Sequence, residues 1–167
     1  MSMKYLTLIG AALVLAACSS EPEPDAGPAT GATGGGGGVA GGPAPNTIEY
    51  FNQVVGDRVF FDTDRFNIDD EAARTLTAQA QWMAANPGTT ATIEGHADER
   101  GTRQYNLALG ARRANAVRLF LIRQGVAADR LRSVTFGKER PIALGSDPAS
   151  WAQNRRGMTV VAGAPSS

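Results

Sequence analysis

The 167-residue sequence contains a single cysteine, Cys18, and a single histidine, His96. One cysteine cannot form a disulfide within the chain, so we expect no disulfide framework. The 16 basic and 16 acidic residues give a formal net charge of +0. This balance argues against a general nucleic-acid-binding protein, which normally has an excess of basic residues. The sequence therefore predicts neither a disulfide-stabilised domain nor a nucleic-acid partner.

The N-terminal apolar run, YLTLIGAALVLAA, is shorter than the about 20 apolar residues that a transmembrane helix needs. It follows Lys4 and ends in small residues, as a secretion signal does, so we expect residues 1–17 to be a signal peptide. The run ends in LAAC, which resembles the lipobox of bacterial lipoproteins. This resemblance implies lipidation of Cys18, and Ser19 after it points to the outer membrane. The alternative is a cysteine buried in an N-terminal helix.

Large apolar side chains are almost absent from residues 19–45, where Val39 is the exception. Such a segment cannot bury enough apolar surface to offset the entropy that is lost on ordering. We therefore expect residues 18–45 to be the lipidated cysteine and a disordered Gly/Pro-rich tether, with a typical reach of roughly 30 Å. Its run of five glycines lacks the preceding strand and the following lysine that a phosphate-binding loop requires.

Residues 46–162 have the patterns of one folded domain. Short runs of β-branched and aromatic residues predict strands, and apolar residues three and four positions apart predict helices. Strands are expected at 58–62, 89–95, 131–137 and 158–162, and helices within 67–88, 103–125 and 146–157. Residues 46–56 fit either a helix or a strand, and residues 163–167 are expected to be a frayed tail. The order β-α-β-α-β-(α)-β predicts an α/β (α+β) fold, a two-layer sandwich with a mixed sheet and helices on one face.

Capping residues define the ends of the expected helices. Asn67 or Asp69 can cap the first long helix, and Ser146 or Asp147 can cap the short one. Gly125 suits the C-terminus of the second long helix. The first long helix is amphipathic, and its apolar face is expected to consist of Leu76, Ala80 and Met83.

The second long helix has two neighbouring stripes when it is plotted at 100° per residue. One apolar stripe is expected to face the sheet and consists of Leu107, Ala111, Ala114 and Leu121. The other is expected at the border of the buried face and consists of Asn106, Gly110, Arg113 and Val117. Asn106 and Arg113, two turns apart, should therefore point the same way at the border of the buried face.

Acids gather after two expected strands, in FFDTD and in GHADERG. Ligand sites in α/β layers often lie at such loops. His96 and Asp98 alone would make a weak metal site, because more nitrogen, sulfur or carboxylate ligands are needed. A hydrolase would need a nucleophile and a base, and no Gly-x-Ser-x-Gly or similar context is present. We therefore expect neither a metal nor another cofactor.

Two interpretations of this charged segment remain open from the residues alone. Asp98 and Arg113 could face one pocket and hold a ligand that carries both charges. Alternatively, His96 could be a loop residue with all its hydrogen bonds made, and Asp98 and Arg113 could form an ion pair that fixes the loop to the helix.

Four segments, FFDTDRFNI, residues 93–117, FGKERP and NRR, together resemble the Pal-type lipoproteins of the OmpA-like C-terminal domain superfamily. The resemblance covers about residues 55–161, in order along the chain. It implies an OmpA-like fold and a protein that is not an enzyme. It also implies non-covalent binding of peptidoglycan through the meso-diaminopimelate residue of the stem peptide.

The resemblance implies roles for particular residues. The family's acid falls on Asp98, which would accept hydrogen bonds from the ammonium of diaminopimelate. Its arginine falls on Arg113, whose planar fork would hold the carboxylate. The remaining ligand-binding positions expected are Phe61, Asp62, Asn106 and His96, while Arg155 and Arg156 are expected to have structural roles.

The resemblance also implies partners: TolB and other Tol proteins, with a role in envelope integrity and cell division. The domain would then face the periplasm from a lipid anchor in the outer membrane. Two alternatives stay open, an enzyme that acts on the cell wall and an interaction module for Tol proteins that does not contact the wall.

Overall fold

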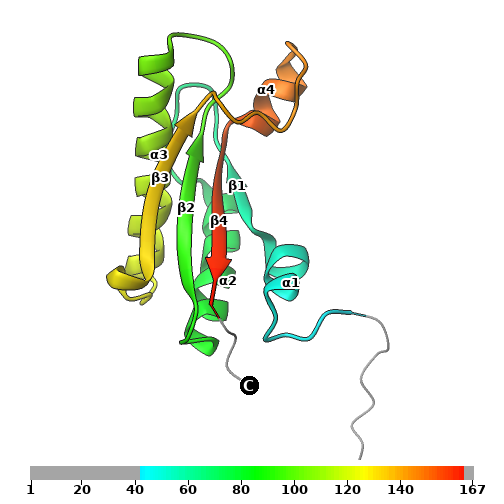
Figure 1. The fold of residues 1–167 in the computed structure, drawn as a ribbon, viewed down its shortest axis with the longest axis vertical. Coiled ribbons are helices and arrows are strands. Elements are labelled where there is room, and N and C mark those ends of the chain that lie inside the picture. Colours follow the sequence, from blue (N-terminus) through cyan, green and yellow to red (C-terminus); the bar gives the residue numbers. More distant parts are fainter. Residues whose placement is uncertain (1–41, 164–167) are drawn as a thin grey trace, which may run out of the picture. The chain divides into compact units, whose positions relative to one another are not determined.

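The computed structural model describes residues 42–163, so the expected signal peptide, the lipidated Cys18 and most of the tether lie outside the described residues. Figure 1 shows the order of the elements. They are α1 (Ile48–Tyr50), the π-helix η1 (Phe51–Gly56), β1 (Arg58–Phe60), α2 (Asp70–Ala85), β2 (Thr90–His96), α3 (Arg103–Arg123), the 3-10 helix η2 (Ala128–Arg130), β3 (Leu131–Gly137), α4 (Pro148–Asn154) and β4 (Arg156–Ala162). None of the helices in this part of the chain is long and apolar enough to cross a membrane.

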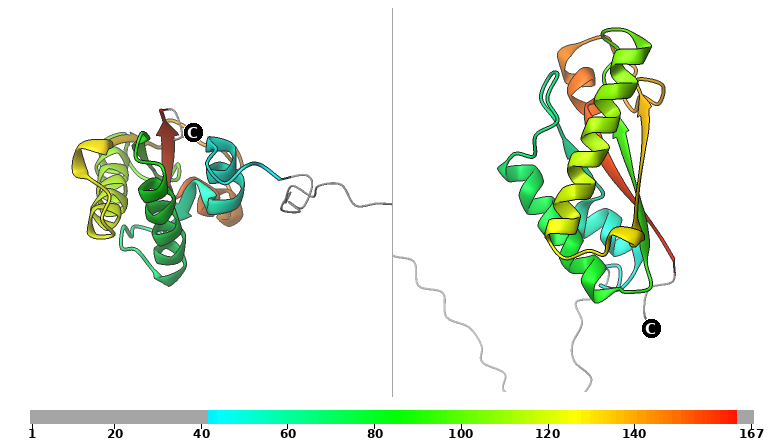
Figure 2. Two further views of the ribbon diagram at one scale, coloured as in Figure 1. Left: turned by 90° about the horizontal axis from the view of Figure 1, so that it is seen from below. Right: turned by 90° about the vertical axis from the view of Figure 1, so that its left-hand side faces the viewer.

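The strands form one mixed sheet in the order β1-β4-β2-β3. β2 and β3 are parallel and are connected through α3, whereas β4 runs antiparallel to both β1 and β2. The two long helices, α2 and α3, cover one face of this sheet (Figure 2). The predicted two-layer α/β arrangement, with a mixed sheet and helices on one face, is confirmed.

The strand boundaries lie close to the predicted ones. β3 has the predicted bounds, β1 is two residues shorter, and β2 begins and ends one residue later. β4 begins at Arg156 instead of Met158, because Arg156 pairs with Phe60 of β1 and Gly157 pairs with Gly95 of β2. Polar residues at the start of β4 carry no strand pattern, so the sequence favours the end of a helix there.

The segment that fits either a helix or a strand is helical. Thr47 caps α1 by accepting a hydrogen bond from the backbone N–H of Tyr50 at 3.1 Å. The ring of Phe51 is fully buried and packs against Trp82, with 4.9 Å between the ring centroids. Gly56 ends the π-helix at a φ of 90°, a conformation that favours glycine.

Of the two predicted caps of α2, Asp69 is the one that forms. Its carboxylate accepts a hydrogen bond from the backbone N–H of Ala72 at 2.8 Å. The predicted apolar face, Leu76, Ala80 and Met83, is buried in the core. At α4 the cap is Asp147, whose carboxylate accepts from the backbone N–H groups of the first helical turn.

The predicted orientation of α3 is wrong by part of a turn. Ala111 is exposed and Leu107 is only half-buried, whereas the stripe expected at the border lies at the centre of the buried face. The cause is a close approach of Gly110 to Gly95 of β2, where a Cβ on either glycine would overlap the backbone of the other. Helix and strand can approach so closely only through glycine, so Gly110, and with it Arg113, faces the sheet.

The C-terminus of α3 agrees with the glycine signal. Gln124 is the C-cap, and Gly125 after it has a φ of 98°. The N–H of Val126 donates to the carbonyl of Leu121 at 3.1 Å, and the N–H of Gly125 donates to the carbonyl of Ile122 at 2.9 Å. These two bonds make a Schellman motif, which satisfies carbonyls that the helix end would otherwise leave without donors.

Candidate ligand-binding site

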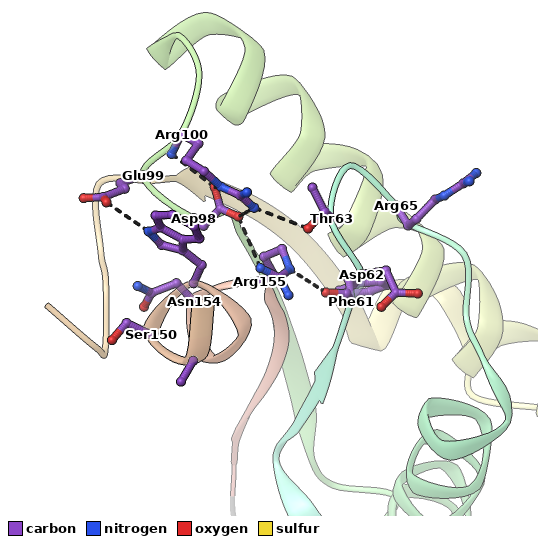
Figure 3. Close-up of polar contacts among 12 residues, drawn as sticks. Phe61, Asp62, Thr63, Arg65, Asp98, Glu99, Arg100, Ser150, Asn154 and Arg155 are labelled. Atoms are coloured by element: carbon purple, nitrogen blue, oxygen red, sulfur yellow. Dashed lines mark hydrogen bonds and ion pairs between the residues drawn. The ribbon is translucent and has the colours of Figure 1, made fainter. Parts of the chain in front are cut away.

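Three segments that are far apart in the sequence meet at one end of the sheet (Figure 3). They are the loop after β2 with Asp98 and Arg100, the loop after β1 with Thr63, and Arg155 between α4 and β4. The sheet order explains the meeting, because β4 lies between β1 and β2 and begins where both of them end. We refer to Asp98, Arg100 and Arg155 as the Asp98 cluster.

The carboxylate of Asp98 accepts four hydrogen bonds. Its Oδ1 atom accepts from the backbone N–H of Arg100 at 3.1 Å and from Nε of Arg100 at 3.2 Å. Its Oδ2 atom accepts from Nη2 of Arg100 at 2.6 Å and from Nη1 of Arg155 at 3.4 Å. A carboxylate has about four lone-pair sites, so the acceptor capacity of Asp98 is filled by protein groups.

These contacts keep Asp98 ionised although the residue is only 7% exposed. Burial by itself raises the pKa of the Asp98 carboxyl, since a low-dielectric surrounding penalises the charged form. The hydrogen bonds and charge of Arg100, with a contribution from Arg155, outweigh burial and hold the pKa below its usual value. Asp98 is therefore a buried negative charge near neutral pH.

Arg113 lies wholly inside the domain, with 0% of its surface exposed. Its Nε atom donates to the carbonyl of Arg65 at 2.9 Å, Nη1 to the carbonyl of His96 at 2.8 Å, and Nη2 to the carbonyl of Asp62 at 3.0 Å. Its Cζ atom lies 5.2 Å from the centroid of the Phe61 ring. Burial lowers the pKa of Arg113 to about 10, with a smaller effect of the like charge on Arg155, so the side chain remains a cation.

The structure brings Asp98 and Arg113 to the same end of the sheet without a direct bond between them in the described part of the chain. They are linked through shared neighbours instead. Arg155 bonds to Asp98 and donates through Nε to the carbonyl of Phe61 at 2.9 Å. Arg113 bonds to the carbonyl of the next residue, Asp62. Of the two open interpretations, a direct ion pair between Asp98 and Arg113 is therefore wrong.

The other expected site residues differ in what their side chains can reach. Phe61 is buried under Arg113, while the side chain of Asp62 is exposed to solvent. Asn106 is 2% exposed and donates through Nδ2 to the carbonyl of Arg100 at 2.7 Å. Asn106 thus fixes the backbone of the loop that carries Asp98.

His96 is the last residue of β2 and is 1% exposed. Its ring stacks on Phe136 with 5.5 Å between centroids, and its Nε2 atom lies 3.3 Å from Oε2 of Glu94. The Nδ1 atom has no hydrogen-bond partner among the described residues, and His96 belongs to β2 and not to the loop after it. Burial lowers its pKa to about 4, with smaller effects of the charges on Arg156 and Arg140. The imidazole is therefore neutral near neutral pH, and the contact of Arg113 is with the backbone carbonyl of His96 and not with its ring.

Two members of the Asp98 cluster were not expected to be there. Arg100 stands two residues after Asp98, and this spacing in a loop is the one signal in the sequence that could have suggested the pair. Arg155 was expected to have a structural role, and its contact with Asp98 adds a second one. Arg156 does serve as support, since it is 3% exposed and its Nη2 atom donates to the carbonyl of Arg140 at 3.2 Å.

Two cavities adjoin the cluster. One has a volume of about 200 Å³ and is lined by Thr63, Asp64, Asp98, Arg100, Gly101 and Tyr105. The other has a volume of about 340 Å³ and is lined by Phe60, Phe61, Asp62, Asp69, Ala152, Gln153 and Arg155. Asp98 opens on the first and Arg155 on the second, so a ligand at this end of the sheet would meet a carboxylate and several guanidinium groups. Residues 42–163 contain no group of three or more His, Cys, Asp or Glu side chains that could hold a metal ion.

Comparison with known proteins agrees with this fold and extends over most of the chain. Residues 60–155 match the model of the OmpA family. A relative from Agrobacterium fabrum, named peptidoglycan-associated lipoprotein, is 50% identical over 154 residues, which are 92% of this chain and 84% of the relative. A protein of the same name from Rhizobium meliloti is 49% identical over 157 residues, 92% of this chain and 85% of that protein.

Among solved structures, the crystal structure of the peptidoglycan-associated lipoprotein from Burkholderia pseudomallei is similar with a TM-score of 0.66 at 40% identity. The similarity covers 71% of this chain and 100% of that one. The expected OmpA-like fold is thereby confirmed. The relatives are named for an association with peptidoglycan and not for a reaction, which confirms the prediction of a non-enzymatic protein. The chain belongs to the OmpA family and, within it, to the peptidoglycan-associated lipoproteins.

Proposed function

We propose that this protein is an outer-membrane lipoprotein whose folded domain binds peptidoglycan without forming a covalent bond, through the meso-diaminopimelate residue of the stem peptide. The observation that carries the proposal is the ionised carboxylate of Asp98, 7% exposed, at the wall of a cavity and surrounded by arginines. The names of the relatives supply the class of ligand.

Diaminopimelate suits such a cluster because its free end carries an ammonium and a carboxylate on one carbon. Asp98 would accept hydrogen bonds from the ammonium, and charge-assisted bonds of this kind contribute about 1.5–3 kcal/mol each. Arg113 has five N–H groups, of which three donate to backbone carbonyls. The other two N–H groups of Arg113 would donate to the ligand carboxylate.

A pull-down with isolated cell-wall sacculi tests this proposal. The protein is compared with Asp98→Asn and with Asp129→Asn, a matched loss of one charge in η2, at the other end of β3. We expect the sacculi to retain the unchanged protein and the Asp129 variant and to release the Asp98 variant. A free stem tripeptide ending in diaminopimelate should compete for binding. Equal retention of all three proteins would contradict the proposal.

The same preparation addresses the alternative of a cell-wall enzyme. Purified muropeptides incubated with the protein are expected to keep their masses, because the proposed site holds a zwitterion and breaks no bond. New muropeptide products that disappear in the Asp98 variant would replace the proposal with an enzymatic one.

The anchor and the protein partners belong to the same proposal. We infer that Cys18 carries the lipid, and mass spectrometry of the mature protein should find the lipidated cysteine at its N-terminus. We infer also that the domain works with TolB and other Tol proteins in envelope integrity and cell division. Co-purification of TolB with the protein would support this partnership, and its absence from cross-linked envelopes would oppose it.

A further inference from the structure

The filled acceptor capacity of Asp98 creates a conflict with ligand binding. Arg100 provides three of the four hydrogen bonds to the carboxylate, two of them from its side chain, and Arg155 provides the fourth. Since a carboxylate accepts about four hydrogen bonds, an incoming ammonium can reach Asp98 only if one of these donors leaves.

Arg100 is the donor that is free to leave. Its side chain is 41% exposed, whereas that of Arg155 is 13% exposed. Arg155 is also held in place by the bond that its Nε atom donates to the carbonyl of Phe61 at 2.9 Å. The departure of Arg100 would uncover both carboxylate oxygens at once, while that of Arg155 would uncover one.

The other contacts of the Arg100 side chain are exposed and weak. Its Nη2 atom donates to Oγ1 of Thr63 at 3.3 Å, and its Cζ atom lies 4.3 Å from the ring centroid of Trp151. Exposed cation–π contacts contribute only about 0.5–1 kcal/mol. Asn106 holds the carbonyl of Arg100 at 2.7 Å, so the backbone of the loop stays in place when the side chain moves.

We propose that Arg100 is a resident cation in the ammonium subsite, and that a ligand binds by exchanging its own ammonium for the Arg100 guanidinium on Asp98. This inference rests on the proposed binding of diaminopimelate and adds the residue that sets its specificity. The exchange means that Asp98 never becomes a buried charge without a partner, which would be costly. A ligand that lacks the ammonium cannot make the exchange and meets an occupied subsite.

Only the molecules in which Arg100 has left Asp98 can bind the ligand. The apparent affinity is therefore the intrinsic affinity multiplied by the fraction of such molecules. Removing the resident cation should therefore strengthen binding, although most substitutions in a binding site weaken it. The variant Arg100→Gln keeps a polar side chain, although a shorter one, and removes the charge. Its matched control is Arg103→Gln, which removes an exposed arginine that pairs with Glu139 at 3.2 Å, away from Asp98.

Titration of the purified full-length protein with a stem tripeptide ending in meso-diaminopimelate measures the effect. Arg100→Gln is expected to bind about two- to tenfold more tightly than the unchanged protein, and Arg103→Gln about equally to it. An analogue whose terminal ammonium is replaced by hydrogen should gain nothing from Arg100→Gln. In an Asp98→Asn background the substitution at Arg100 should no longer strengthen binding.

Weaker or unchanged binding by Arg100→Gln, with the unchanged protein binding normally, would overturn the exchange and leave the proposed function standing. An equal gain in Arg103→Gln would also overturn it, because the effect would then come from overall charge. Failure of the unchanged protein to bind the tripeptide at all would overturn the proposed function and, with it, this inference.

Discussion

The guanidinium of Arg113 donates through Nη1 to the backbone carbonyl of His96 at 2.8 Å, so the end of β2 is tied to the middle of α3. The same guanidinium holds the carbonyls of Asp62 and Arg65 in the loop after β1. One buried cation therefore fixes the two loops that carry the candidate site. Its position in the core makes it a support of the fold as well as a proposed ligand-binding residue.

Replacing Arg113 by alanine is expected to destabilise the domain. Three backbone carbonyls would lose their donor in a buried place, and each such loss costs about 1–3 kcal/mol. We expect the free energy of unfolding in urea to fall by about 3–5 kcal/mol. Arg113→Lys should recover only part of it, since one ammonium cannot copy the planar fork. A loss below about 1 kcal/mol in Arg113→Ala would show that these bonds do not support the fold.

Loss of binding in an Arg113 variant has two possible causes, because Arg113 supports the fold as well as the proposed site. A variant that no longer binds sacculi could have lost the ligand contact or the fold. Asp98→Asn is the cleaner test, because Asp98 bonds to the side chains of Arg100 and Arg155 and to one backbone N–H. We expect its far-ultraviolet circular dichroism to match that of the unchanged protein.

Because Gly110 contacts Gly95, replacing Gly110 by alanine should lower stability, although helix propensity alone would predict a gain. An alanine in the middle of an exposed helix would stabilise it by about 1 kcal/mol over glycine. Gly110→Ala should instead destabilise the domain by about 3 kcal/mol or more, because its Cβ would overlap the backbone of Gly95. Gly42→Ala, which meets no atom within 4 Å, should change stability by less than about 0.5 kcal/mol. Thermal unfolding of the two variants measures the difference, and a stabilised Gly110→Ala would refute the close packing.

The burial of His96 should make the folded domain less stable as the pH falls below neutral. Burial lowers its pKa from 6.5 to about 4, so between these values the unfolded chain binds a proton that the folded protein does not. Stability must therefore fall as the pH drops through this window, by a total on the order of 3 kcal/mol. Glu94 lies 3.3 Å from the ring and would favour its protonation, whereas the charges on Arg156 and Arg140 oppose it.

The control for this prediction is His96→Gln, which removes the titrating group. Urea unfolding at intervals from pH 7 to pH 4 should show a steep loss of stability for the unchanged protein and a shallower one for the variant. Parallel stability curves for the two proteins would mean that the imidazole has the same pKa in the folded and unfolded states, which would contradict the prediction.

Much of the fold follows from local patterns in the sequence. The bounds of β3 and the glycine at the end of α3 depend on neighbouring residues and were predicted correctly, and the cap of α2, Asp69, is one of the two residues predicted for it. The orientation of α3 was not, because it depends on Gly110 meeting Gly95 across two layers. A helical plot that counts only apolar side chains places Ala111 on the buried face and leaves Gly110 and Arg113 at its border. It therefore predicts the wrong buried face for α3.

The location of the candidate site could be predicted from the sequence, but its hydrogen bonds could be predicted only in part. Strand ends and acidic loops pointed to the end of the sheet where Asp98 lies. The partners of Asp98 depend on which side chains tertiary packing brings to it, and Arg155 comes from the far end of the chain. The burial of Arg113 beneath the loop after β1 likewise follows from packing that no spacing in the sequence encodes.

Calorimetric titration of the protein and of Asp98→Asn with a tripeptide ending in meso-diaminopimelate tests the central claim most directly. The account predicts saturable binding with one site for the unchanged protein. It predicts binding at least about tenfold weaker for Asp98→Asn, since one charge-assisted bond contributes about 1.5–3 kcal/mol. Asp129→Asn should bind as the unchanged protein does. Equal affinities for the unchanged protein and Asp98→Asn would contradict the account.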